Sequence, residues 1–406
     1  MFNIEKIRAE FPILETAKKA NKNFAYLDSG ATSQKPSCVI EKEKEVYTSF
    51  NSNIHRGVHR LSNISTTEYE NARQEVATLI GCDDTKEIIF TSGATASLNL
   101  VASAWGGTFI KKGDEVIVSE MEHHSNIVPW QLICDRVGAT IKVIPFFDNG
   151  ELDMATFERL LNEKTKVVAV TQCSNVLGTI NDIKTICKKA HECGAIVVVD
   201  GCQAVVHQKV NVKSLDCDFY AFSGHKYYAP TGIGVLYGKK ELLEAMPPYM
   251  GGGDMVAHVS FKKTTYAALP LKFEAGTSNY VGAISLAEAI RFVRTVGMDE
   301  IMSHEKSLID YAMAEMSKIE GLKIYGTTPN KDCIISFNIE GIHPYDLGMI
   351  LDKQGIAIRT GTHCAEPTMT HYGVTGMARA SFAMYNTIDE IDRLVGGIKV
   401  AIQMLK

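Results

Sequence analysis

Short apolar runs of five or six residues, most of them rich in β-branched side chains, recur between residues 87 and 237. They lie at residues 87–91, 115–119, 140–144, 166–171, 195–199, 218–222 and 233–237, and turns and helical patterns separate them. The runs are apolar continuously rather than at every second position, which is typical of strands covered on both faces. The pattern predicts an α/β fold with a seven-stranded, mainly parallel sheet.

The pattern of apolar and polar residues changes after about residue 285. Longer amphipathic patterns predict helices over 284–296, 299–319 and 387–405, and short apolar runs predict strands over 322–325, 333–339 and 356–359. Such a mixture is typical of an α+β unit. We therefore expect a large domain over residues 26–285 and a smaller α+β domain made of residues 1–25 and 286–406.

Composition excludes some classes of function. The 406 residues carry a net charge of −5 and no basic tail, which argues against a nucleic-acid or membrane surface. Residues 1–10 mix charges with apolar residues, unlike a signal peptide, and no run is long enough to span a bilayer. We expect a cytoplasmic protein. Its ten cysteines are scattered without a Cys-x-x-Cys pair, so we predict reduced thiols and no metal site.

Lys226 ends the apolar run of residues 218–222, in the segment Ser223-Gly-His-Lys226. A lysine amine that loses its charge can attack a carbonyl carbon and form a Schiff base. Ser223 and His225 beside it can donate hydrogen bonds to a phosphate. Taken alone, this lysine would be interpreted as a solvated loop residue. The residues at the other strand ends favour a site for pyridoxal 5'-phosphate.

Three other strand ends carry polar groups, and ligands of parallel sheets gather at such ends. Residues 91–97 form a small-residue turn that opens a helix, where free N–H groups and the side chain of Thr95 favour phosphate. His123 could stack on an aromatic ring or shuttle a proton, although an isolated histidine is more often an ordinary loop residue. The side-chain amide of Asn175 could bind a carboxylate.

Asp200 ends the apolar run of residues 195–199. A carboxylate there is costly to bury without a partner, and a helix N-cap is its commonest role. A pyridinium nitrogen is the alternative partner. At about 4 Å and an effective dielectric near 20 the attraction is roughly 4 kcal/mol, which raises the ring nitrogen pKa by about three. Gln203 could then reach the ring hydroxyl.

The smaller domain adds two arginines and one unusual cysteine. Arg379 and Arg359 offer forks for a substrate carboxylate, although a surface ion pair is the commoner role of an arginine. Cys364 follows His363 in Arg359-Thr-Gly-Thr-His-Cys-Ala-Glu-Pro367, which predicts an exposed loop with cationic neighbours. Such neighbours raise the thiolate fraction, so Cys364 is our candidate nucleophile.

At these residues the chain resembles the SUF-type (SufS-like) cysteine desulfurases, pyridoxal-phosphate enzymes of fold type I in the class V aminotransferase superfamily. The resemblance covers nearly the whole chain and includes Tyr26-Leu-Asp-Ser-Gly-Ala-Thr32, His55-Arg-Gly57, Glu122-His-His124, Ser174-Asn-Val-Leu-Gly178, Val199-Asp-Gly-Cys-Gln203, Ser223-Gly-His-Lys226, Phe273-Glu-Ala-Gly-Thr277 and residues 359–367.

The resemblance implies a role for each of these side chains. Lys226 would hold the cofactor and move the Cα proton, His123 would stack on the ring, and Asp200 and Gln203 would bind its nitrogen and hydroxyl. Its phosphate would be held by Thr95, Ser223, His225 and, from the partner subunit of a homodimer, Thr277. Asn175 and Arg379 would bind the substrate carboxylate.

The implied reaction converts L-cysteine to L-alanine and leaves a persulfide on Cys364. A SufE- or SufU-like acceptor protein would then carry the sulfur toward iron–sulfur cluster assembly. Ala96 and Thr362 depart from the family pattern, where glutamate and histidine are frequent, and bear on regulation and partner contacts. A selenocysteine lyase, another class V enzyme and a non-catalytic scaffold remain alternatives.

Overall fold

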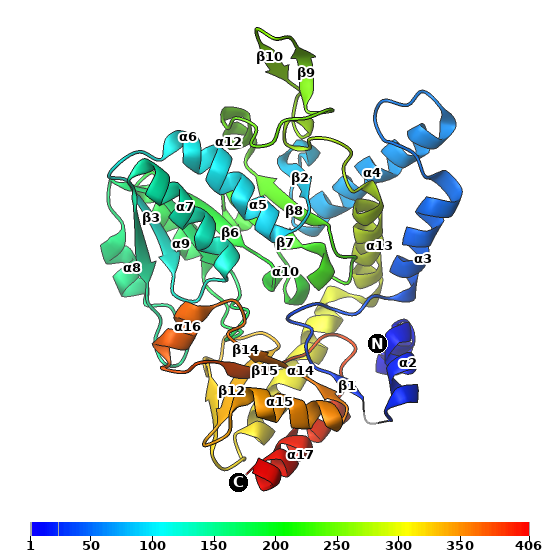
Figure 1. Cartoon of the computed structure of the whole chain (residues 1–406), viewed down its shortest axis with the longest axis vertical. Coiled ribbons are helices and arrows are strands. Elements are labelled where there is room, and N and C mark those ends of the chain that lie inside the picture. Colours follow the sequence, from blue (N-terminus) through cyan, green and yellow to red (C-terminus); the bar gives the residue numbers. More distant parts are fainter. Residues whose placement is uncertain (1, 23, 406) are drawn as a thin grey trace.

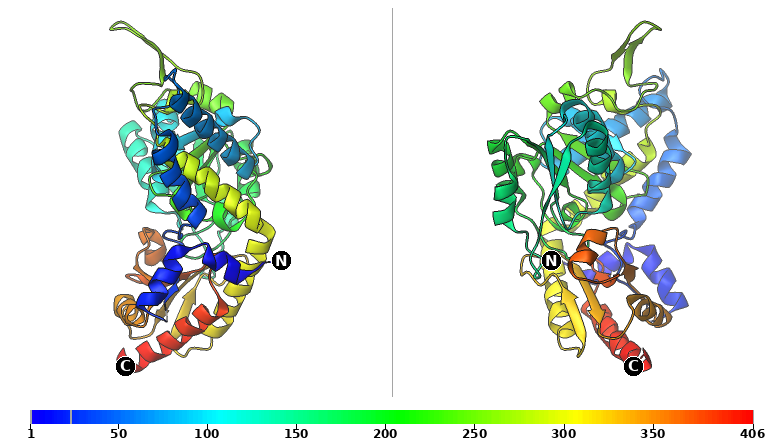
Figure 2. Two further views of the ribbon diagram at one scale, coloured as in Figure 1. Left: turned by 90° about the vertical axis from the view of Figure 1, so that its right-hand side faces the viewer. Right: turned by 60° about the vertical axis from the view of Figure 1, so that its left-hand side comes forward.

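Two large buried apolar clusters organise the chain in the computed structural model, which describes residues 2–22 and 24–405 (Figure 1). The first surrounds a seven-stranded sheet and the second a four-stranded sheet. Figure 2 shows the second as a separate lobe that carries the C-terminal helix at its far end.

All seven predicted strands of the large sheet are present, each within about one residue of its expected ends. In spatial order they are β2 (Ile88–Thr91), β8 (Gly234–Gly238), β7 (Phe219–Ser223), β6 (Ile196–Asp200), β5 (Thr165–Thr171), β3 (Glu115–Ser119) and β4 (Thr140–Ile144). Only β8 runs antiparallel to its neighbours, β2 and β7. The prediction of a mainly parallel α/β sheet is therefore confirmed.

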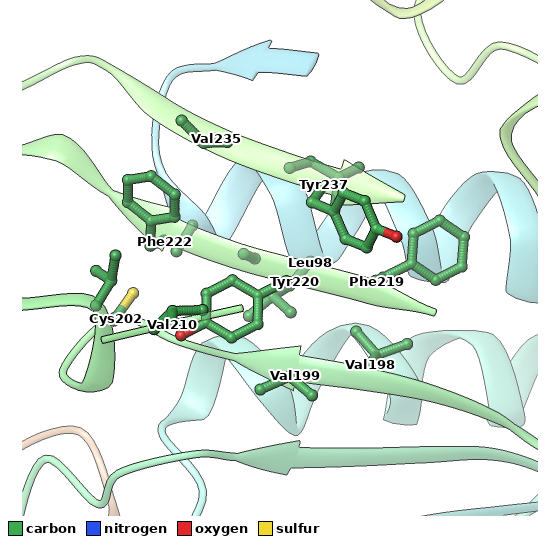
Figure 3. Packing of buried hydrophobic residues seen from close by; sticks show 14 of the residues in the cluster. Leu98, Val198, Val199, Cys202, Val210, Phe219, Tyr220, Phe222, Val235 and Tyr237 are labelled. Carbon is green, nitrogen blue, oxygen red and sulfur yellow. The ribbon is translucent and has the colours of Figure 1, made fainter. Parts of the chain in front are cut away.

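The sheet is buried because helices pack along its strands. The helices of this part are α5 (Ala94–Val101), α6 (Gly107–Phe109), α7 (Val128–Val137), α8 (Met154–Leu160), α9 (Ile183–Glu192), α10 (Ala204–His207), α11 (Val212–Leu215) and α12 (Lys240–Ala245). Figure 3 shows the packed side chains of β6, β7 and β8, which include Val198, Val199, Phe219, Tyr220, Phe222, Val235 and Tyr237. This packing explains why the strands are apolar continuously.

A second group of helices packs beside the sheet. These are α3 (Ser37–Glu45), α4 (Arg60–Leu79) and α13 (Tyr280–Val296). A two-stranded hairpin of β9 (Val256–Val259) and β10 (Thr264–Tyr266) projects from the top of Figure 1. No helix in the described part of the chain combines the length and apolar character needed to cross a bilayer.

The smaller sheet is antiparallel and has the order β11 (Leu322–Tyr325), β12 (Ile334–Ile339), β15 (Met377–Ser381) and β14 (Arg359–Gly361). Its helices are α14 (Met298–Met316), α15 (Pro344–Lys353), α16 (Glu366–His371) and α17 (Ile388–Leu405). Sequence analysis missed β15, because its small residues and an arginine lack the β-branched pattern of a strand. Pairing with β12 and β14 on its two sides holds it in the sheet.

The N-terminal segment contacts both lobes. It forms α1 (Ile4–Ala9), α2 (Pro12–Ala20) and β1 (Ala25–Tyr26), and β1 pairs with β13 (Ile356–Ala357) of the smaller lobe. Ile7, Phe11 and Leu14 join the first cluster, and Arg8 pairs with Glu390 of α17 at 2.9 Å. The predicted boundary near residue 285 falls inside α13, whose buried apolar residues join the first cluster except Val281 and Ile284, which belong to a third, small cluster. Within α14, Ile301 joins the first cluster, whereas Leu308, Ile309, Ala312 and Met316 join the second.

A buried ion pair joins α4 to the loop after the hairpin. The Arg73 guanidinium contacts both carboxylate oxygens of Glu274, at 2.6 and 3.0 Å, and lies against the rings of Tyr69 and Phe90. Tyr69 Oη and the Phe90 backbone N–H also donate to this carboxylate, at 2.8 and 2.7 Å. Both carboxylate oxygens of Glu274 thus accept hydrogen bonds, and these bonds offset the cost of burying the two charges.

Breaking this pair is expected to destabilise the protein strongly. Glu274→Gln keeps the shape of the side chain but removes the buried negative charge, so that the buried Arg73 guanidinium keeps only the partly exposed Glu70 carboxylate as an ion-pair partner. The expected loss is up to about 3–5 kcal/mol of the free energy of unfolding. Urea titration followed by fluorescence measures this loss. The matched control is Asp310→Asn, which breaks the exposed Lys306–Asp310 pair and should cost less than about 1 kcal/mol. Equal losses in the two variants would contradict the structural role of Glu274.

Candidate active site

The carboxyl ends of the sheet strands meet loops of the smaller lobe around a cavity of about 220 Å³. Ten of the twelve predicted site residues line it: Thr95, His123, Asn175, Asp200, Ser223, His225, Lys226, Arg359, Cys364 and Arg379. Parallel strands bring their carboxyl ends to one edge, and β5, β6 and β7 each deliver one or more of these side chains there. The predicted convergence of residues 95–226 at one edge is thus present.

Lys226 lies in a 3-10 turn, Gly224–Lys226, that directly follows β7. The preceding carbonyl, that of His225, accepts hydrogen bonds from Thr32 Oγ1, the Ser33 backbone N–H and Lys35 Nζ, at 3.0, 3.2 and 2.8 Å. These three donors fix the backbone of the turn. As a result, the Lys226 side chain lines the cavity.

The N-terminus of α5 forms one wall of the cavity. The Ala94 backbone N–H donates to Ser223 Oγ at 2.8 Å, and Thr95 Oγ1 is 2.7 Å from Ser125 Oγ. A Cβ on Gly234 would lie 2.3 Å from Gly93 Cα, so only glycine at that position of β8 lets the helix start this close to the sheet. Free N–H groups of a helix N-terminus beside two hydroxyls form an anion site.

Two of the three imidazoles that line the cavity, those of His123 and His225, are neutral at pH 7. Burial, followed by the Lys226 charge, lowers the pKa of His123 to about 4, and the same two causes lower the pKa of His225 to about 4. The Ser125 backbone N–H donates to His123 Nδ1 at 3.1 Å, so the proton of that ring lies on Nε2. A neutral ring in this position can stack on an aromatic group without adding charge.

Glu122 makes hydrogen bonds that stabilise the turn carrying His123. It is fully buried and accepts hydrogen bonds from Ser119 Oγ, from Asn126 Nδ2 at 2.7 Å and from the Thr171 backbone N–H at 2.8 Å. Burial raises the pKa of its carboxyl to about 8. The contacts tie the turn that carries His123 to the end of β5.

Asp200 ends β6 and is only 5 % exposed. It does not cap a helix, because α10 begins later, at Ala204, with Gln203 at the N-cap. One carboxylate oxygen accepts from the Cys202 backbone N–H at 3.0 Å. The commoner interpretation of this aspartate as a helix cap is therefore wrong, and its carboxylate faces the cavity.

Arg379 is buried rather than placed on the surface. Its Nη1 donates to the Asn175 carbonyl at 2.8 Å and its Nη2 to Asp28 Oδ1 at 3.3 Å, whereas its buried Nε has no partner among the described residues. Arg359 donates to the same aspartate from Nε and Nη2 and is half exposed. The two guanidinium groups thus share one carboxylate and leave a net positive charge at the cavity.

Cys364 lies in an exposed loop, as the sequence predicts. The expectation of a cationic His363 is wrong: burial, followed by the Arg379 charge, lowers the pKa of His363 to about 3, so that ring is neutral. The nearby cations are Arg359 and Arg379, both close enough to interact electrostatically with the Cys364 thiol.

Two predicted residues lie outside the cavity. Gln203 is buried and its side-chain amide donates to the Gly30 carbonyl at 2.8 Å. Thr277 lines a different pocket of about 230 Å³, near Ala96 and Tyr249. Their predicted contacts with a cofactor, which for Thr277 involve a second subunit, stay predictions.

Two further residues shape the site without having been singled out. Asp28 pairs with both arginines, and Ser125 joins Thr95 to His123. Asp28 lies in a segment that carries the family resemblance, residues 26–32, and Ser125 directly follows another, residues 122–124. Asp28 is recognisable only by its contacts with two arginines that lie far away in the sequence. The spacing of residues along the chain does not reveal such contacts.

Three buried side chains of metal-ligating type meet elsewhere, between the lobes. His207 of α10, Glu305 of α14 and Cys333 offer ligand atoms that lie within 4.8 Å of one another. His207 Nδ1 is 2.8 Å from Glu305 Oε2. Burial alone would lower the pKa of His207, but the Glu305 carboxylate raises it overall. Burial also raises the pKa of the Glu305 carboxyl. The pair is therefore a buried hydrogen-bonded contact between the lobes.

This fold and site define an α/β protein with a lysine amine, a carboxylate and imidazoles around one cavity at the carboxyl edge of its sheet. The chain belongs to the class-V aminotransferase family, whose family model matches residues 25–394.

Named relatives are similar over the full length. A cysteine desulfurase of Dickeya dadantii is 50% identical over 98% of this chain and 96% of its own. The crystal structure of the cysteine desulfurase CsdA of Escherichia coli, in an S-sulfonic acid form, is 40% identical, covers all of both chains and has a TM-score of 0.93. The apo cysteine desulfurase of Thermococcus onnurineus is 38% identical, with a TM-score of 0.94 over 99% of this chain and 98% of its own.

Proposed function

We propose that this protein is a pyridoxal 5'-phosphate-dependent cysteine desulfurase of the SUF type. It converts L-cysteine to L-alanine and transfers the sulfur to Cys364. The observation that carries the proposal is the meeting of Lys226, Asp200, His123 and Cys364 around one cavity. The full-length similarity to named cysteine desulfurases supports the same activity.

The residues around the cavity fit this cofactor. Lys226 would hold its aldehyde carbon, Asp200 its ring nitrogen, and Thr95, Ser223, His225 and the N-terminus of α5 its phosphate. The N–H groups at that helix end and the buried Asp200 carboxylate suit a ligand with an anionic end and a cationic ring. When bound, the cofactor supplies an electron sink that stabilises negative charge at the substrate Cα.

The protein side chains divide the remaining work. Arg379 and Asn175 bind the substrate carboxylate, with Arg359 at the rim, because a positive charge and a side-chain amide meet there. Lys226 takes the Cα proton and returns one. Gln203 would bind the ring hydroxyl of the cofactor.

Cys364 accepts the sulfur. In balance, L-cysteine and the Cys364 thiol give L-alanine and a Cys364 persulfide. The substrate C–S bond is replaced by a C–H bond and a new S–S bond forms, so no external oxidant is needed. Arg359 and Arg379 lie close enough to interact electrostatically with the Cys364 sulfur that attacks.

The functional unit is a homodimer in which Thr277 of one subunit contributes to the phosphate site of the other. The position of Thr277 away from its own cavity supports this assignment. A SufE- or SufU-like protein in the cytoplasm takes the sulfur from the exposed Cys364 loop toward iron–sulfur cluster assembly.

Product analysis tests the activity. Purified protein supplied with pyridoxal phosphate and L-cysteine should form alanine and a protein persulfide, and a SufE- or SufU-like acceptor should raise the rate. Alanine and persulfide are measured by mass spectrometry, with L-serine as the control substrate. Absence of alanine with every acceptor would favour a non-catalytic scaffold. Turnover of selenocysteine alone would favour a selenocysteine lyase, and transamination without persulfide another class V enzyme.

A further inference from the structure

The loop that carries Cys364 has an unusual backbone. His363 and Cys364 have φ angles of +54° and +56°, a region that side chains other than glycine seldom adopt. Two residues of the large lobe hold the carbonyls of these positions: Asn175 Nδ2 donates to the His363 carbonyl at 2.8 Å and the His124 backbone N–H to the Cys364 carbonyl at 2.9 Å. The loop therefore depends on contacts across the cavity to keep its shape.

A side-chain contact reinforces this attachment. The His124 ring pairs through Nε2 with the Glu366 carboxylate, two residues beyond Cys364. Thr362 Oγ1, two residues before Cys364, donates to Glu366 Oε1 at 3.0 Å. Thr362 is also one of the two positions where the chain departs from the family pattern. Cys364 thus lies between Thr362 and Glu366, which contact each other. Glu366 also contacts His124, in the turn that carries His123.

The proposed function requires Cys364 to meet two partners. Its sulfur must reach the substrate in the cavity and then meet an acceptor protein outside it. Cys364 both lines the cavity and is exposed, so movements of its loop decide how readily the sulfur faces outward. His124 and Glu366 are partly exposed, with 37% and 55% of their side chains accessible, so their contact is weak enough to break in each cycle.

We propose that His124, Glu366 and Thr362 form a clip that controls how often the Cys364 loop opens. These are positioning residues, because they act on the thiol through the loop and not on the substrate. The inference rests on the assignment of Cys364 as sulfur acceptor, but the clip itself is defined by contacts of this chain.

The rate of Cys364 alkylation tests the clip without requiring activity. In Glu366→Gln and Thr362→Val the loop should open more often, so iodoacetamide should modify Cys364 about two- to fivefold faster than in the parent protein, the range expected for losing an exposed ion pair. Thr362→Ser retains a hydroxyl and should restore the parent rate. Labelling of the nine other cysteines is subtracted with Cys364→Ala.

Salt separates the clip from a general structural effect. Salt screens the pairing of a protonated imidazole with a carboxylate, so at about pH 6, where an ordinary imidazole is largely protonated, the parent rate should rise with ionic strength toward the rate of Glu366→Gln, whose own rate should change less. Equal rates in the parent protein, Glu366→Gln and Thr362→Val, with no salt dependence in the parent, would overturn the clip. If a variant fails to fold, the salt titration of the parent protein decides. Sulfur release by Cys364→Ala would instead overturn the proposed function and leave the alkylation result standing.

Discussion

Replacing Lys226 by alanine is expected to abolish alanine formation from L-cysteine, by at least about 10³-fold, because a positioned acid–base group alone contributes 10²–10⁴-fold. The variant should also lose its covalent attachment to pyridoxal phosphate. Borohydride treatment of the loaded protein followed by peptide mass spectrometry measures this attachment. In the parent protein the label should lie on the peptide that contains Lys226.

The matched control is Lys306→Ala, which removes an exposed lysine of α14 and should leave activity unchanged. A covalent label on a lysine other than Lys226 in the parent protein would refute the assignment. So would undiminished alanine formation by Lys226→Ala. Either result would leave the fold intact but remove the basis of the proposed chemistry.

Replacing Cys364 by alanine should remove the protein persulfide while the cofactor stays bound. Alanine formation should fall by about 10²-fold or more, equivalent to about 2.7 kcal/mol of activation free energy. Cys364 lies in an exposed loop and makes no core contact, so folding and cofactor absorbance should be retained. Persulfide is measured by alkylation and mass spectrometry after exposure to L-cysteine.

Cys38→Ala and Cys193→Ala serve as controls, because these two thiols are partly exposed but lie outside the cavity. Both variants should keep the parent level of persulfide on Cys364. Full sulfur transfer by Cys364→Ala would exclude this residue as acceptor. Cleavage of selenocysteine but not cysteine by the same variant would support the lyase alternative.

The meeting of these residues at one cavity could be predicted because they follow strands of one mainly parallel sheet. Each of Thr95, His123, Asn175, Asp200 and Lys226 comes just after an apolar run. In a mainly parallel sheet these ends converge at one edge whatever the details of packing. The local pattern is therefore sufficient to place the five residues together.

The contacts of the smaller lobe could not be predicted in this way. Arg359 and Arg379 meet Asp28 across more than 300 residues of chain, and Glu366 meets His124 across 242. Contacts between residues so far apart leave no repeating pattern in the sequence from which they could be predicted. Strand β15 likewise depends on its partners rather than on its own residues.

By itself, then, the sequence determined the α/β class, the order of the large sheet's strands along the chain, and the lysine, carboxylate and imidazole at their ends. Tertiary structure alone decided that the two arginines share Asp28, that His363 is neutral, and that the Cys364 loop is held by His124 and Glu366. The reason is physical. Strand patterns arise from local burial, whereas charge states and loop contacts depend on which surfaces of the two lobes pack together.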